Sequence, residues 1–159
     1  MHPTTLAISL IALLLLAAAP NPPAPKPSMA PTPAAAASAK EPEHITIQHV
    51  LIGFTGSVPG KNITRTQDEA KKLAEEIFAR AKKGEDFDGL VQKYTDDSPP
   101  GICTMANKGV APAAGEYARN RMVPAFGDAG FPLQVGEFGM ASYDKEKSPF
   151  GWHIVKRLR

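Results

Sequence analysis

Apolar and polar positions alternate in two stretches at opposite ends of the charged part of the chain, residues 44–54 (HITIQHVLIGF) and 150–158 (FGWHIVKRL). This pattern is typical of strands, and apolar residues on both faces indicate strands that are buried on both sides. We expect the two strands to lie side by side at the centre of one sheet. Each carries a histidine, His49 and His153, so this pairing would make the two side chains neighbours.

Between these strands, apolar residues recur at helical spacing. Thr66 and Glu69 form a capping box, because the hydroxyl and the carboxylate can each accept a bond from a free backbone N–H of the first turn. The apolar stripe that follows predicts a helix that ends before Gly84. Apolar residues within 85–94 repeat at intervals of 3, 4 and 7, which predicts a second, shorter helix.

The remaining elements are shorter. After the turn TDDSPPG, residues 102–115 are rich in small residues and show no period, so we expect irregular structure there. Residues 123–129 predict a short helix with a proline in its first turn, and residues 138–142 predict a short strand. The order of one strand, three helices and two strands predicts a single α+β domain with a small sheet.

The first 43 residues differ in composition from the rest. Residues 6–19 form an apolar run that is interrupted by a single serine. This run predicts that residues 1–19 are a signal peptide or an uncleaved N-terminal anchor. Residues 20–43 are rich in Pro and Ala and cannot bury a core, so we expect a disordered linker. The folded domain would then be residues 44–159 of an exported, periplasmic or otherwise extracytoplasmic protein, with a membrane tether if the anchor is retained.

Charge and cysteine content exclude several classes of function. The formal net charge of the 159-residue chain is +2, and no basic stripe interleaved with aromatic residues points to nucleic acid. The single cysteine, Cys103, leaves no intramolecular disulfide and has no hydrolase signature around it. The histidines, including His44, lack metal-ligand spacing. We therefore expect no metal, no cofactor and no nucleic acid.

Five segments, in order, carry a family likeness. They are QHVLI, RTQDEAKKLAEEI, KKGEDFDGLVQKYTDDSP, RNRMVPAFGDAGFPLQVGEFG and SPFGWHIVKRLR. Through them the chain from His44 to Arg159 resembles the parvulin family of peptidyl-prolyl cis-trans isomerases. The resemblance implies a four-stranded antiparallel sheet wrapped by about four helices, preceded here by the disordered tail.

The resemblance also implies a set of catalytic residues. His49 and His153 fall on the two histidines that lie on adjacent central strands at the floor of the family's active site. Asp97 falls where the family has a carboxylate or thiol after the second helix. Ser148, five residues before His153, matches a hydroxyl position near the histidine pair.

A second set of residues would bind the substrate. Met122 and Phe126 match the pocket for the proline ring, and Tyr117 matches a further aromatic position. The chain departs from the family in the stretch NKGVAPAAGEYARNRM, where parvulins carry a glycine-rich turn with a bulky leucine. Ala114 stands where that leucine would be, which predicts a shallower pocket wall.

The function implied is isomerisation of X-Pro bonds by a non-covalent, twisted-amide mechanism, assisting the folding of exported proteins. The partners would be proline-containing, unfolded or partly folded polypeptides, and we expect a monomer. The alternative is a binding module that grips unfolded chains without catalysis, which the altered stretch 107–115 favours. Recognition of phosphoserine before proline needs a basic cluster, whereas only Lys61 and Arg65 fall near the relevant loop.

Overall fold

The computed structural model describes residues 40–159. The predicted signal segment or anchor, residues 1–19, and the predicted linker up to residue 39 lie outside the described residues. The strands are β1 (His44–Ile52), β2 (Ile102–Ala106), β3 (Tyr117–Ala118), β4 (Phe138–Ala141) and β5 (Trp152–Arg157). The helices are α2 (Gln67–Lys82), α3 (Phe87–Tyr94) and α4 (Pro124–Gly130), with one 3-10 turn, η1 (Arg119–Arg121). Within this part of the chain, no helix has both the length and the apolar character needed to cross a membrane.

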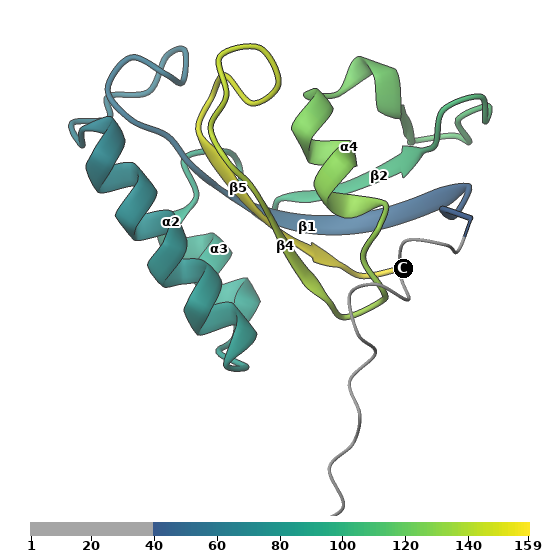
Figure 1. Cartoon of the computed structure of the whole chain (residues 1–159), viewed down its shortest axis with the longest axis horizontal. Helices are drawn as coiled ribbons and strands as arrows, with labels where there is room; N and C mark the ends of the chain where they lie inside the picture. Colours follow the sequence, from purple (N-terminus) through teal and green to yellow (C-terminus); the bar gives the residue numbers. More distant parts are fainter. Residues whose placement is uncertain (1–39) are drawn as a thin grey trace, which may run out of the picture. The chain divides into compact units, whose positions relative to one another are not determined.

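The five strands form one sheet in the order β3-β2-β1-β5-β4 (Figure 1). The neighbours β1 and β5 pair antiparallel along six residues, which confirms that the first and last strands lie side by side in the middle of the sheet. The predicted α+β class is also confirmed. The strand count differs slightly from the prediction, because the short edge strand β3 pairs parallel with β2 and makes the sheet mixed.

Residues 102–115, which we expected to be irregular, contain β2 and most of the segment that leads to β3. β2 pairs antiparallel with β1, with Cys103 opposite Ile47. A five-residue strand has too few positions to show a period of its own, so the pairing with a distant segment specifies it. The two residues of β3 carry no local signal at all.

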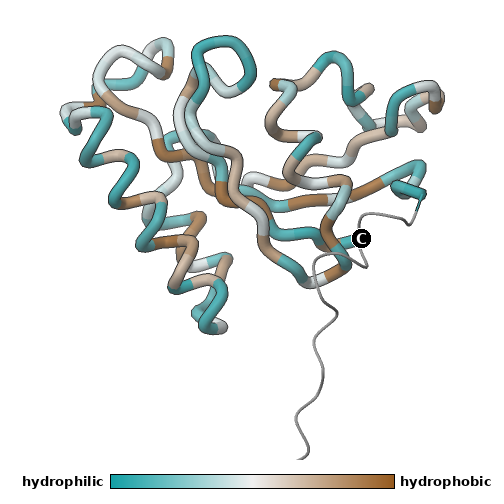
Figure 2. Tube along the Cα trace, in the orientation of Figure 1, coloured by the Kyte–Doolittle hydropathy of each residue, from teal (hydrophilic) through white to brown (hydrophobic). Residues whose placement is uncertain are grey.

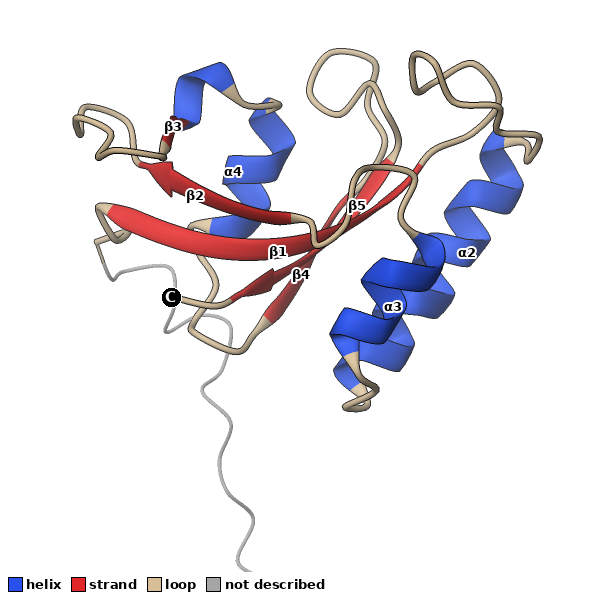
Figure 3. Cartoon of the chain, turned by 180° about the vertical axis from the view of Figure 1, so that it is seen from behind, coloured by secondary structure: helices blue, strands red, loops and turns tan. Residues whose placement is uncertain are grey.

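The helices α2 and α3 cover one face of the sheet (Figures 1 and 3). The predicted capping box is present at the start of α2, where Thr66 Oγ1 accepts from the backbone N–H of Glu69 at 3.3 Å. Gly84 follows the helix with φ of +90°, as a C-terminal glycine does. The apolar residues buried between this face and the two helices form the larger core of the domain: Val50, Ile52, Ala70, Ala74, Ile77, Ala81, Phe87, Leu90, Val91, Trp152 and Ile154.

The opposite face of the sheet carries α4 and a smaller core. Alternate residues of β1 point to the two faces, so Ile45 and Ile47 meet Phe126 of α4 and Phe131, while Val50 and Ile52 meet α2 and α3. Figure 2 shows hydrophobic residues concentrated along the strands, whereas α2 alternates between hydrophilic and hydrophobic positions. The prediction that β1 is buried on both faces is confirmed.

The last residues of the predicted linker are tied to the domain. Glu41 Oε2 lies 2.6 Å from Nη1 of Arg119, a side chain that is only 8% exposed. The side chain of Asn107 also donates to the Pro42 carbonyl at 2.9 Å. The described contacts of the domain therefore begin at Glu41, three residues before the predicted boundary at residue 44.

Candidate active site

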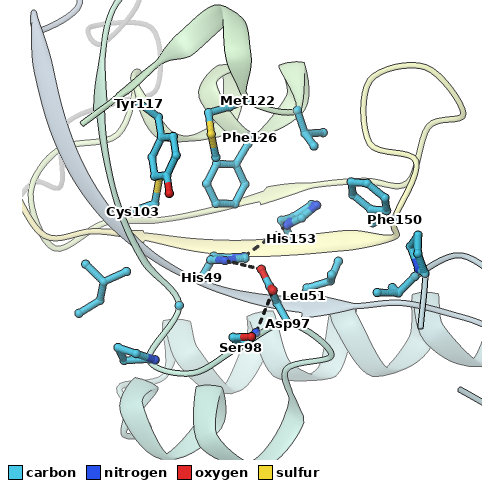
Figure 4. Close-up of a pocket in the computed structure, with 16 residues that line it drawn as sticks. His49, Leu51, Asp97, Ser98, Cys103, Tyr117, Met122, Phe126, Phe150 and His153 are labelled. Atoms are coloured by element: carbon cyan, nitrogen blue, oxygen red, sulfur yellow. Dashed lines mark hydrogen bonds and ion pairs between the residues drawn. The ribbon is translucent and has the colours of Figure 1, made fainter. Parts of the chain in front are cut away.

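A cavity of about 620 Å³ opens on the face of the sheet that carries α4. Its floor comes from β1 and β5, and its walls come from α4, the loop after α3 and the loop after β1 (Figure 4). Two short segments of the sheet edge, at Ile102 and at Tyr117, complete the lining. The cavity therefore gathers residues from nearly the full length of the domain.

His49 and His153 meet at the floor of this cavity. His153 pairs with Leu51 and His49 pairs with Val155, so the two histidines are diagonal neighbours on one face of the antiparallel pair. Their Nδ1 atoms lie 3.4 Å apart, and both residues are buried. The sequence-based expectation that the two histidines are neighbours is confirmed.

Asp97 lies in the turn after α3, at the side of His49 (Figure 4). Its Oδ2 atom is 3.4 Å from His49 Nε2, and its Oδ1 atom accepts from the backbone N–H of Ser98 at 2.8 Å. The hydrogen bond from His49, assisted by the bond from Ser98, lowers the pKa of Asp97 to about 2. A fixed negative charge therefore stands at the mouth of the cavity at any ordinary pH.

His153 stays neutral in this arrangement. Burial, reinforced by the neighbouring His49, lowers its pKa to about 3. With Asp97 ionised, His49 carries its proton on Nε2 and donates it to the carboxylate. Neutral His153 carries its proton on Nδ1, which faces Nδ1 of His49 at 3.4 Å. His153 Nε2, buried without a hydrogen-bond partner, is then a lone pair, whereas an unpaired N–H there would cost more free energy.

The next residue back, Asp96, holds the turn rather than the site. Asp96 Oδ2 accepts from the backbone N–H of Gly53 at 2.7 Å and pairs with the guanidinium of Arg65. The sequence TDD contains two adjacent carboxylates, Asp96 and Asp97, and the structure gives them different roles. Asp96 fastens the turn to the end of β1, so that Asp97 reaches the cavity.

Gly101 closes the same loop against β1. Its φ is +67°, and a Cβ built there would lie 2.5 Å from the carbonyl oxygen of His49. The backbone N–H of His49 donates to the Gly101 carbonyl at 2.9 Å. Only glycine allows this approach, which fixes the loop beside the histidine strand.

Phe126 and Met122 form the apolar side of the cavity. Phe126 lies in the first turns of α4, where Pro124 is the first helical residue. Its ring packs edge-on against His49 and His153, with centroids 4.6 Å and 5.2 Å away. Met122 and Tyr117 also line the cavity, so three of the four predicted pocket residues are brought together with the histidines and Asp97.

Arg119 fixes the position of α4. Its guanidinium bonds Glu41 at 2.6 Å, the Asn107 side chain at 2.8 Å and Asp128 of α4 at 2.8 Å. The guanidinium also stacks over the ring of Phe131, 4.5 Å from its centroid. One buried cation therefore joins the chain before β1, the loop after β2 and the helix that carries Phe126.

Two of the predicted site residues lie elsewhere. Ser148 is fully buried and does not line the cavity; its hydroxyl donates to the Gly151 carbonyl at 2.7 Å and so holds the turn before β5. Ala114 is exposed and lines a second hollow of about 430 Å³, beside His44 and Glu116. The ten residues between β2 and β3 carry Ala114 away from the cavity, so it forms no wall of the proline pocket.

The sequence reasoning missed several lining residues, above all Cys103 and Phe150. Cys103 lies on β2, within the stretch that the sequence pattern predicts to be irregular, and it lines the cavity. Burial raises the pKa of its thiol to about 11, so it remains protonated and serves as a small apolar surface. Phe150 could have been found from its place in SPFGWH, three residues before His153.

The histidines of the described region do not build a metal centre. No group of three or more His, Cys, Asp or Glu side chains within residues 40–159 is arranged to hold a metal ion. The site consists of an apolar cleft, a buried histidine pair and one carboxylate. Such a set can grip an apolar ring and set an electric field, but it contains no activated nucleophile.

Comparisons with known proteins agree with this geometry. A family model described as the PPIC-type PPIase domain matches residues 35–158. The chain is 37% identical to the foldase protein PrsA of Caldanaerobacter subterraneus subsp. tengcongensis over 86 residues, 54% of this chain and 24% of that protein. It is 34% identical to the chaperone SurA of Chromohalobacter salexigens over 113 residues, 69% of this chain and 21% of that protein. The chain thus spans about a quarter or less of the length of these relatives.

A solved structure is similar over most of the described domain. The peptidyl-prolyl isomerase ESS1 from Candida albicans superposes with a TM-score of 0.57 at 24% identity, covering 74% of this chain and 63% of that one. At this identity the likeness concerns the fold.

Proposed function

The chain belongs to the PPIC-type peptidyl-prolyl cis-trans isomerase family, and from that premise we propose that its cavity catalyses cis-trans isomerisation of X-Pro bonds. The observation that carries the proposal is the convergence of Met122, Phe126, Asp97 and the histidine pair on one cavity. The whole protein would act on proline-containing, unfolded or partly folded polypeptides.

The reaction needs no covalent chemistry. Rotation about an amide bond crosses a barrier of about 18–20 kcal/mol, because the C–N bond loses its partial double-bond character in the twisted state. An uncatalysed X-Pro bond takes tens to hundreds of seconds to isomerise. The protein must therefore bind the twisted amide more tightly than the planar one.

The apolar side of the cavity would hold the proline ring. Met122, Val123 and Phe126 present an apolar surface, which suits the hydrocarbon ring of proline. The buried floor of the cavity excludes water beneath this surface. A ring gripped here stays fixed while the preceding carbonyl turns. Binding energy from the ring is then available to orient the bond that rotates.

Asp97 would favour the twisted state electrostatically. Amide resonance places negative charge on the carbonyl oxygen, and twisting reduces that charge. An ionised carboxylate that faces the oxygen therefore penalises the planar amide more than the twisted one. His49 holds Asp97 through Nε2, and His153 holds His49, so we assign the histidines a positioning role.

The alternative function is a module that binds unfolded chains without isomerising them. Its support in the sequence is the altered stretch 107–115. Residues 113–115 line the second hollow rather than the cavity, so this departure from the family leaves the proline pocket untouched. We therefore favour catalysis.

We further propose that the protein is exported. The support is the apolar run 6–19, which suits a signal peptide or an anchor. Its clients would then be proteins that fold outside the cytoplasm. The mass of the mature N-terminus distinguishes cleavage near residue 19 from a retained anchor, and a full-length protein found in the cytoplasm would contradict export.

A protease-coupled assay on a proline-containing tetrapeptide tests the catalytic proposal. We expect the wild-type chain to accelerate isomerisation and Met122→Ala to lose most of the activity. Met140→Ala is the matched control, because Met140 packs against the α2 and α3 side of the sheet. Binding of the peptide without acceleration by the folded wild-type protein would favour the binding module instead.

A further inference from the structure

A short segment before β1 is fastened to the loop after β2. We call this segment, residues 41–43, the strap. The backbone N–H of Asn107 donates to the Glu43 carbonyl at 2.8 Å. The side-chain amide of Asn107 donates to the Pro42 carbonyl at 2.9 Å and to Glu41 Oε2 at 3.2 Å. One asparagine therefore bonds to every residue of the strap and fixes its course over the domain.

Glu41, the first residue of the strap, places its carboxylate against a buried cation. Its Oε2 atom accepts from Arg119 Nη1 at 2.6 Å, and Arg119 is only 8% exposed. Asp128 is the other carboxylate on this guanidinium, and its side chain is 56% exposed, against 39% for Glu41. A buried charge depends on its partners to replace lost hydration, and the partner that is itself less hydrated does so more strongly. Glu41 is therefore the stronger of the two restraints on Arg119.

Arg119 in turn packs against the backbone of α4. A Cβ built on Gly127 would lie 2.8 Å from both Cγ and Nε of Arg119, so the stem of the arginine lies directly on the helix. Arg119 Nε is buried and has no hydrogen-bond partner among the described residues. The Nη atoms alone fix the side chain, through their bonds to Glu41, Asn107 and Asp128. Without Glu41, the guanidinium is free to turn toward Asp128 and solvent, and the stem then leaves Gly127.

The helix α4 depends on such contacts because it is short. It has seven residues, and its N-cap residue Val123 makes no side-chain hydrogen bond. Tertiary packing, rather than intrinsic propensity, stabilises helices of this length. Phe126 directly precedes Gly127, and its ring packs against the histidine pair at the floor of the cavity (Figure 4). A shift of α4 would therefore displace the apolar side of the proline pocket.

Resting on the proposed isomerase function, we propose that the strap is a positioning element for the proline pocket and that Glu41 is its positioning residue. Glu41 holds Arg119, Arg119 holds α4, and α4 presents Phe126 to the proline ring. No residue of the strap lines the cavity. Loss of the Glu41 carboxylate should therefore weaken proline binding while the twisting of the bound amide beside Asp97 proceeds as before. The affinity of the pocket thus depends on how the chain is fastened where it enters the domain.

The test compares two glutamates of the strap in the full chain. Glu43 carries the same charge as Glu41 two residues later, but it is exposed, and its side chain pairs with Lys40 at 3.8 Å. Magnetisation-exchange NMR at several concentrations of a proline peptide gives kcat and KM, and titration with the same peptide gives Kd. We expect Glu41→Ala to raise KM and Kd about three- to tenfold, with kcat within twofold. Glu43→Ala should change none of the three values.

Two further measurements trace the route of the effect. In Glu41→Ala the ring resonances of His49 and His153 should shift, because the Phe126 ring beside them moves. The indole resonance of Trp152, in the core under α2 and α3, should stay in place. Arg119→Met removes the cation and keeps an unbranched apolar stem, a replacement that buried ionic sites often tolerate. In that background Glu41→Ala should raise KM no further, since its effect passes through the arginine.

The outcomes separate this proposal from the isomerase function. A folded Glu41→Ala protein whose KM and Kd stay at the wild-type values would overturn the strap and leave the isomerase proposal standing. An equal rise in Glu43→Ala, or a fall in kcat with KM unchanged, would also overturn it. A wild type that binds the peptide without isomerising it would refute the isomerase function, and the ratio of the two Kd values would then decide on the strap. A wild type that neither binds nor isomerises the peptide would overturn both.

Discussion

The two faces of the central sheet differ in what they bury. The face under α2 and α3 holds a core of eleven buried residues, all of them apolar. The face under α4 holds a smaller apolar cluster, and beside it lie the cavity and the histidine pair. Alternation along β1 and β5 sends one set of side chains to each face, so the same two strands build both.

This difference separates stability from chemistry. Buried polar groups cost free energy unless they are hydrogen-bonded, and the α4 face accepts that cost at His49 and His153. The α2 and α3 face compensates with dense apolar packing behind the same backbone. Changes on one face should therefore affect stability most, and changes on the other should affect activity most.

The largest expected loss of stability comes from the α2 and α3 face. Ile77 is fully buried in that core, and Ile77→Ala should lower the free energy of unfolding by about 2–5 kcal/mol, through lost burial and the cavity left behind. Denaturant unfolding measures it. Activity per folded molecule should stay within twofold.

The exposed Glu75 on the same helix supplies the control, since Glu75→Ala should change stability by less than about 0.5 kcal/mol. A stable Ile77→Ala protein with a tenfold loss of activity would show that the two faces are not separable.

A substitution of Arg119 tests whether this side chain, which does not line the cavity, fixes the position of α4. Arg119→Ala removes the cation that joins Glu41 to Asp128, and it should cost about 2–3 kcal/mol, less than a fully buried pair because both carboxylates reach solvent. Loosening of α4 should also raise KM more than it lowers kcat. Arg121→Ala, in the same 3-10 turn but exposed, should do neither.

A smaller effect should appear in the pH dependence of stability. The folded pKa of His153, about 3, lies below its ordinary value of 6.5. As the pH falls below 6.5, His153 becomes protonated in the unfolded chain but stays neutral in the folded one. The free energy of unfolding therefore decreases, by up to about 1.4 kcal/mol per pH unit. Denaturant unfolding at pH 7, 6 and 5 measures the slope.

NMR measures the protonation of His153 directly and independently of stability. The ring resonances of His153 should not titrate between pH 8 and 5, whereas a midpoint near 6.5 would contradict a buried, neutral His153. The low pKa of Asp97, about 2, affects stability only below about pH 4, outside this window.

Local patterns predicted the elements that carry their own signal. The capped helix α2 and the two histidine strands follow from periodicity and capping chemistry, and the neighbouring histidines follow from the pairing of those strands. The strands β2 and β3 could not be predicted, because pairing with distant segments creates them. With β2 unrecognised, its lining residues Ile102 and Cys103 were missed as well.

The site was predictable where the spacing along the chain was preserved. Met122, Phe126 and Asp97 each lie a fixed number of residues from a helix that the sequence predicts clearly, and all three reach the cavity. Ala114 does not, because the segment between β2 and β3 loops outward and shifts any alignment made by counting. Ser148 does not reach the cavity either, because the turn before β5, which only the folded chain specifies, directs its hydroxyl to the Gly151 carbonyl.

The central claim is that Asp97, held by His49, drives isomerisation from the α4 face. The most direct test is the isomerisation rate of a proline peptide, measured by magnetisation-exchange NMR with the wild type and with the variant His49→Ala, Asp97→Ala, after circular dichroism has shown that the variant is folded. The account predicts a loss of kcat/KM of about tenfold or more. A folded variant that loses less than about twofold would contradict it.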